Sequence, residues 1–103
     1  MQKEITLLFN TLYKTVLQNA QIEIPELCNN ITIINIGTTQ AVIDSALPLN
    51  AGVPGTNNGE SFTYGGNKGE MFYGRLNVAF PAGGVGNVLI IFKIYLPNQQ
   101  ALQ

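Results

Sequence analysis

The residues that could do chemistry are few, and their spacing supports no catalytic group. The chain has no histidine and a single cysteine, Cys28. Without histidine, Ser-His-Asp and Cys-His catalysis, histidine-ligated metals and the commonest general base are all excluded. Cys28 has Glu26 nearby, and a neighbouring carboxylate raises the pKa of a thiol. We therefore expect Cys28 to act as a small hydrophobic side chain and not as a nucleophile.

The carboxylates are spread along the chain without a pattern typical of a site. A glycosidase-like pair such as Glu23 with Glu70 has no support from its spacing. No DxDxDG-type loop is present for calcium, and the glycines of GGNKGE and AGGVGN do not follow the spacing of a phosphate loop. We expect no enzymatic activity, no metal and no cofactor. The six acidic residues, interpreted as solvated loop or edge charges, are Glu4, Glu23, Glu26, Asp44, Glu60 and Glu70.

Composition favours a protein that works in an assembly. The 103 residues suffice for one domain, and only 11% of them are charged, against roughly a quarter in an average globular domain. A surface so poor in charge has little protection against association. The net charge of −1 comes without a basic cluster, so nucleic acid is not an expected partner. No apolar run is long enough for a signal-peptide core or a membrane span, so we expect synthesis in a host cytoplasm and no membrane partner.

The strongest structural signal lies between Met71 and Leu96, where two apolar segments flank the glycine-rich PAGGVGN. This pattern predicts a long β-hairpin, with Pro81 ending the first strand and glycines supplying positive-φ positions in the turn. The second segment alternates with period two, but both of its faces are largely apolar. One face carries Val88, Ile90, Phe92, Ile94 and Leu96, and the other carries Leu89, Ile91, Lys93 and Tyr95. The turn glycines are Gly83, Gly84 and Gly86.

A strand that is apolar on both faces needs a second layer or a neighbouring subunit to cover its outer side. This requirement, together with exposed aromatics and an apolar N-terminal segment, predicts the surface for protein contacts. The residues that we expect to contact partners are Leu8, Leu12, Tyr73, Leu89, Ile91 and Tyr95.

Residues 1–20 form an amphipathic segment whose structure the sequence leaves open. Apolar residues recur at helical spacing, which slightly favours a helix. Its threonines favour the alternative, an extended strand arm. The apolar residues in question are Ile5, Leu8, Phe9, Leu12, Val16 and Leu17.

Residues 21–103 read as a β-domain of six to eight short strands separated by turns. Strands are predicted at 21–24, 31–36, 41–43 and 61–64, with 41–43 interpreted as the return leg of a hairpin. The predicted fold is therefore all-β: a compact antiparallel β-sandwich, jelly-roll-like, preceded by the N-terminal helix or strand arm.

A corner at Asn35-Ile36-Gly37 follows one predicted strand, and polar turns at Gly59-Glu60 and Gly69-Glu70 precede two others. In these features residues 31–96 resemble small β-sandwich proteins of phage virions, namely capsid-decoration and head-fibre or adaptor subunits. The resemblance implies a non-enzymatic structural protein located in the virion. Its partners would be other copies of itself, in a homo-oligomer, and other virion proteins such as the major capsid protein. No binding residue is carried over, because the matching features form no site motif.

An alternative from another class is a carbohydrate- or receptor-binding module. Its candidate surface combines the Gly-, Pro- and Asn-rich loop Asn50–Gly59 with Tyr64 and Tyr73. Loops of this composition often carry binding residues.

Overall fold

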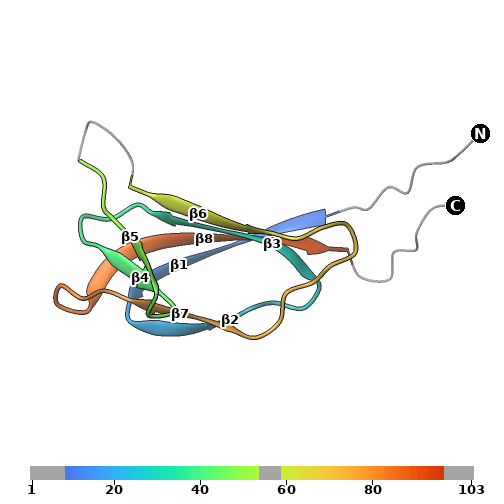
Figure 1. Ribbon diagram of the computed structural model, residues 1–103, viewed down its shortest axis with the longest axis horizontal. Helices are drawn as coiled ribbons and strands as arrows, with labels where there is room; N and C mark the ends of the chain where they lie inside the picture. The colour runs from blue at the N-terminus through green and yellow to red at the C-terminus, as the bar shows by residue number, and fades with distance from the viewer. Residues whose placement is uncertain (1–8, 54–58, 97–103) are drawn as a thin grey trace, which may run out of the picture.

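The computed structural model describes residues 9–53 and 59–96, which form eight β-strands in two antiparallel sheets and no helix. Figure 1 shows the sheets as two layers. The first sheet has the order β1 (Phe9–Gln18), β8 (Val85–Tyr95), β3 (Cys28–Asn35) and β6 (Ser61–Gly65). The second has the order β2 (Ala20–Glu23), β7 (Arg75–Ala79), β4 (Ala41–Ile43) and β5 (Leu47–Leu49). The predicted all-β, sandwich-like fold is confirmed.

The core lies between the two sheets and draws side chains from both. Alternate residues of the central strands are buried, as expected when one face of each strand packs inward. The first sheet contributes Ile31, Ile33, Val88, Ile90 and Phe92 to this core, and the second contributes Ile43, Leu49, Leu76 and Val78. Burial of this apolar surface is the main favourable term that holds the layers together.

β8 follows the predicted division of its faces from Val88 to Lys93. Val88 and Ile90 are fully buried against the second sheet, whereas Leu89 and Ile91 are only half-buried and Lys93 is exposed. Tyr95, predicted on the face of Leu89 and Ile91, is buried instead. β8 lies between β1 and β3, so it is hydrogen-bonded on both sides. Its β-branched residues suit this central position.

The predicted hairpin over residues 71–96 is wrong. β7 and β8 are consecutive, but β7 pairs with β2 and β4 whereas β8 pairs with β1 and β3. The glycine-rich segment carries the chain from one sheet to the other. Gly83 and Gly84 have φ values of 86° and 75°, as predicted for a reversal. Gly86 serves close packing instead, because a Cβ there would lie 2.3 Å from the Phe80 ring.

Residues 41–43 form a strand with the predicted bounds, but not the return leg of a hairpin with β3. β4 pairs with β5 and β7 in the second sheet, whereas β3 belongs to the first. The corner between β3 and β4 contains the predicted Asn-x-Gly turn. The side-chain oxygen of Asn35 accepts a hydrogen bond from the Gly37 amide at 3.0 Å. Its amide group donates to the carbonyls of Thr39 and Leu49 at 2.8 and 2.9 Å, so this buried side chain ties the two sheets together.

The slight preference for a helix over the N-terminal segment is wrong for the residues that the structure describes, because residues 9–18 form β1. Along Phe9 to Val16 this strand pairs continuously with β8. Val16 is its only buried residue, so the apolar side chains at helical spacing do not form one buried stripe. The threonines and the pairing with β8 favour the extended conformation. β1 is the edge of the first sheet; residues 1–8 lie outside the described part.

Candidate functional site

The described carboxylates that make hydrogen bonds serve turns and do not converge. Asp44 accepts from the Asn77 amide at 2.9 Å, and Glu60 accepts from the Asn50 amide at 2.7 Å. Glu70 closes its own turn by accepting from the amide three residues before it at 2.6 Å. Within residues 9–53 and 59–96, no three histidine, cysteine, aspartate or glutamate side chains gather into a group that could hold a metal ion. These three carboxylates therefore stabilise turns and loops through hydrogen bonds to backbone amides.

Cys28 is buried and protected from reaction. Its side chain is fully inaccessible, and its thiol donates a weak hydrogen bond to the Asn30 carbonyl at 3.5 Å. Burial raises the pKa of the thiol, and this effect outweighs the opposing one of the backbone hydrogen bond. The reactive thiolate is consequently disfavoured at neutral pH.

The outer surface of the first sheet carries the predicted contact residues Leu89 and Ile91. By strand register, Leu89 lies beside Ile34 and Ile91 lies beside Tyr13. None of these four residues belongs to the buried core or to the side chains packed against it, and Tyr13 is 68% exposed. We call Tyr13, Ile34, Leu89 and Ile91 the outer patch. It is an apolar surface on the side of the sheet that faces away from the core.

The other predicted contact residues do not join the outer patch. Tyr95 is buried: its ring stacks on Phe9 at 4.8 Å and its hydroxyl accepts a hydrogen bond from the Gly69 amide. Tyr73 is 75% exposed but lies in the loop between β6 and β7. Leu12 lies on β1 and lines a groove described below, and Leu8 is outside the described residues. The structure thus distributes the predicted contact residues that it describes over several places.

The described parts of the candidate carbohydrate surface lie apart from one another. Tyr64 is half-buried, packs against the core and contacts the Phe62 ring edge-to-face at 4.7 Å. The described ends of the Asn50–Gly59 loop lie beside Asn35, at the end of β3 opposite to the one near Tyr73. Residues 54–58 of that loop lie outside the described part of the chain.

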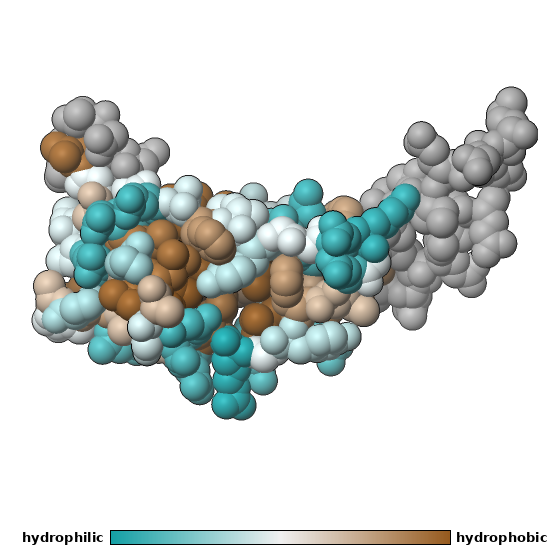
Figure 2. Space-filling view, viewed as in Figure 1, coloured by the Kyte–Doolittle hydropathy of each residue, from teal (hydrophilic) through white to brown (hydrophobic). Residues whose placement is uncertain are grey.

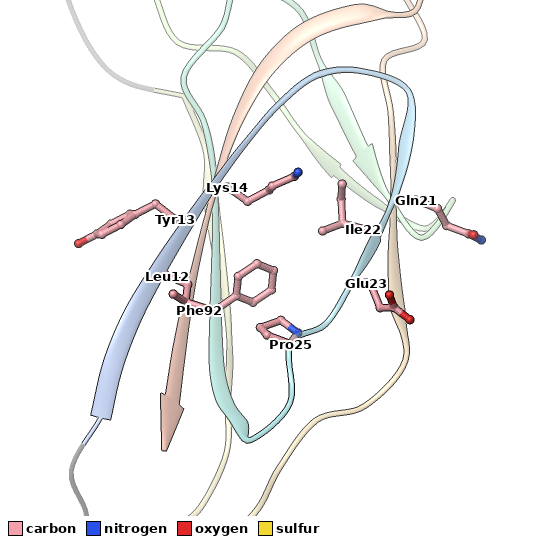
Figure 3. Close-up of a pocket in the computed structure, with 8 residues that line it drawn as sticks. All are labelled: Leu12, Tyr13, Lys14, Gln21, Ile22, Glu23, Pro25 and Phe92. Carbon is pink, nitrogen blue, oxygen red and sulfur yellow. The ribbon is translucent and has the colours of Figure 1, made fainter. Parts of the chain in front are cut away.

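A groove runs along the edge of the molecule where β1 and β2 diverge. It consists of two adjoining hollows of about 350 and 580 Å³ that share Lys14, Gln21 and Ile22. In Figure 3, Lys14 from β1 and Ile22 from β2 point toward each other across it, with Phe92 between the strands. Tyr13 and Gln21 point away. Sequence reasoning missed this groove, because its two walls come from strands of different sheets and its floor from β8.

Comparisons with protein families, with curated proteins and with solved structures identified no match to this chain. The part of the chain that the structure describes contains no helix long and apolar enough to cross a membrane. The functional argument therefore depends on the surfaces themselves.

Proposed function

We propose that this chain is a non-enzymatic structural subunit of a virion, of the capsid-decorating or head-fibre type, that acts through protein–protein contacts. The observation that supports this most is the outer patch: four neighbouring side chains on the sheet face opposite the core, three of them aliphatic. Contiguous apolar surface outside the core is a feature of interaction sites in soluble proteins. The low share of charged residues, 11%, points the same way.

Strand order supports a jelly-roll fold for the subunit. The first strand pairs with the eighth, the second with the seventh, the third with the sixth and the fourth with the fifth. Such nesting arises when one long antiparallel ribbon wraps so that each half contributes to both sheets. Jelly rolls of eight strands in two sheets occur in viral capsid proteins, but also in lectins and cupins. The strand order therefore supports the fold, and the outer patch supports the function.

The proposed docking partner is another virion protein, such as the major capsid protein. Contact with the outer patch would remove Leu89 and Ile91 from water. Burying apolar surface contributes about 25 cal/mol per Å², and a standard protein interface buries roughly 800 Å² on each partner. The hydrophobic centre and the surrounding threonines of this face match the usual arrangement of an apolar core with a polar rim.

The experiment uses particles purified by density gradient from cells that encode the chain. Mass spectrometry of the particle band should find the chain as a stoichiometric component. A tagged copy with Leu89→Glu and Ile91→Glu should fold, by circular dichroism, but be missing from the band. The matched control is Thr38→Glu with Gln40→Glu, which has the same added charge and spacing at exposed positions between β3 and β4, outside the outer patch and its rim. This control should be incorporated normally.

Two results would contradict the proposal. One is the absence of the wild-type chain from purified particles. The other is incorporation of the Leu89→Glu, Ile91→Glu variant at the wild-type level, which would show that the outer patch is not the docking surface.

A further inference from the structure

The four edge strands of the two sheets differ in their capacity to pair with another chain. Edge strands are normally protected against pairing with another chain because they are short or because they carry proline or charged residues. β2 and β5 have four and three residues, Pro48 lies at the centre of β5, and β6 has five residues. β1 has ten residues and no proline. Within residues 9–53 and 59–96, no strand pairs with the outer edge of β1, which lies on the side where β1 and β2 meet.

This edge also exposes apolar side chains. Leu12 and Leu17 of β1 are 43% and 58% exposed. Beside them runs the groove between β1 and β2, with the apolar Ile22 and Phe92 inside it. A strand with one unpaired edge next to an apolar groove offers both backbone hydrogen bonds and surface to bury, which are the two requirements of strand addition.

The charges of the groove indicate which partner fits. Lys14 and Glu23 are the only described residues with a formal charge among those that line the two hollows. Lys14 is on the β1 wall and Glu23 on the β2 wall, so each wall has one charge of opposite sign (Figure 3). A surface built this way is complementary to a second copy of itself.

A twofold axis parallel to the edge satisfies this complementarity. Figure 3 shows β1 rising to the corner at the top and β2 descending from it, so the two strands run in opposite directions. Rotation about such an axis places β1 of one copy antiparallel beside β2 of the other. The wall that carries Lys14 in each copy then faces the wall that carries Glu23 in the other copy. An isologous contact of this kind closes after two copies and does not propagate into a fibre.

We propose that two copies of this chain associate through the β1–β2 edge, with the Lys14 wall of each copy against the Glu23 wall of the other. The inference rests on the proposed function and deepens it, because a dimer would give a structural subunit two copies of the outer patch with which to dock. The proposed self-contact uses a different surface from the outer patch, so either proposal can be refuted while the other stands.

The test is a charge swap followed by sedimentation velocity on a dilution series of the purified full-length chain. The wild type should be a monomer–dimer system. Lys14→Glu and Glu23→Lys should each raise the dissociation constant by about tenfold or more, because each turns attraction across the contact into repulsion. The double variant should return close to the wild-type value, since the opposed charges are restored with their signs exchanged.

Circular dichroism and thermal melts accompany every variant, and Lys14→Gln with Glu23→Gln replaces any single variant that fails to fold. Each neutral variant should weaken the dimer, though less than a reversed charge does. A wild type that stays monomeric at every concentration overturns the inference, as do single variants that dimerise normally or a double variant that is not rescued. Leu89→Glu with Ile91→Glu should still dimerise. A monomeric wild type found in particles would therefore refute this inference while leaving the proposed function intact.

Discussion

At the edge formed by β5 and β6 both strands are short and β6 carries two aromatic residues, whereas at the edge formed by β1 and β2 one long strand borders an open groove. On β6, Phe62 and Tyr64 turn inward and pack edge-to-face, and Pro48 interrupts hydrogen bonding on β5. Figure 2 views the molecule as in Figure 1 and shows apolar residues gathered in its left half, with hydrophilic residues around them. On β1, nine of the ten residues are exposed or half-buried. The two sheets together thus have one edge that is protected against strand addition and one edge that can still pair with another chain.

The largest loss of stability is expected for a substitution at the floor of the groove. Phe92 is 4% exposed and lies between Leu12 of β1 and Ile31 of β3. Phe92→Ala should lower the free energy of unfolding by about 3–5 kcal/mol, through lost burial and the cavity left behind. Urea denaturation measures this. Phe62→Ala, at a ring that is 40% exposed on the opposite edge, should cost less than half as much. Equal costs would contradict the difference in burial between these two positions.

The corner that opens the β1–β2 edge depends on one side chain. Asn19 connects β1 to β2, and its side-chain oxygen accepts a hydrogen bond from the Phe80 amide at 2.7 Å. Asn19→Ala should cost about 1–3 kcal/mol, because the part-buried amide loses its acceptor. The matched control is Asn50→Ala, whose side chain accepts a hydrogen bond from Gln40 on the exposed surface. Its effect should stay within about 0.5 kcal/mol. Thermal melts that rank the two variants in the opposite order would contradict this prediction.

The aromatic pair on the protected edge should contribute a measurable coupling. Phe62→Leu, Tyr64→Leu and the double variant form a double-mutant cycle. Their coupling free energy should be about 0.5–1.5 kcal/mol, in addition to the stabilisation that each ring contributes by its own burial. A coupling indistinguishable from zero would mean that the two rings protect this edge only through separate burial.

The smallest expected effect is on the pH dependence of stability, and it involves Tyr64 at the edge formed by β5 and β6. Burial, and to a lesser degree the negative charge of Asp44, raise the pKa of Tyr64. The folded state therefore holds this proton more tightly than the unfolded state does. Its contribution to stability is complete below the unfolded pKa of about 10 and is lost as pH rises through the folded value. Tyr64→Phe should show a shallower decline in stability above about pH 10; an unchanged slope would count against the assignment.

Local patterns predicted six of the eight strands, namely β2, β3, β4, β6, β7 and β8, because alternation and β-branched residues act within a few positions. No strand was predicted at β5, and a helix was slightly favoured over β1. The strand at 41–43 has its predicted bounds, and the two faces of β8 follow the predicted alternation from Val88 to Lys93. The pattern could not show which strands pair. Two strands joined by a glycine-rich turn look alike in sequence whether they form a hairpin or pass between sheets, and the choice is made by distant partners, β1 and β2.

β1 was hard to predict for a related reason. An edge strand with one buried residue has almost no burial pattern, so its apolar residues matched helical spacing by chance. Among the candidate contact residues, Leu89 and Ile91 were found from alternation alone. The groove was not, since Lys14, Ile22 and Phe92 come from three strands and meet only when both sheets are formed.

The most direct test of the difference between the edges is amide hydrogen exchange by NMR, measured residue by residue in dilute and concentrated samples. If the β1–β2 edge is the self-contact, amides of β1 and β2 gain protection as concentration rises, and those of β5 and β6 do not. Concentration-independent exchange throughout, or protection gained at β5 and β6 instead, would contradict the central claim that the long edge is the one that binds a second copy.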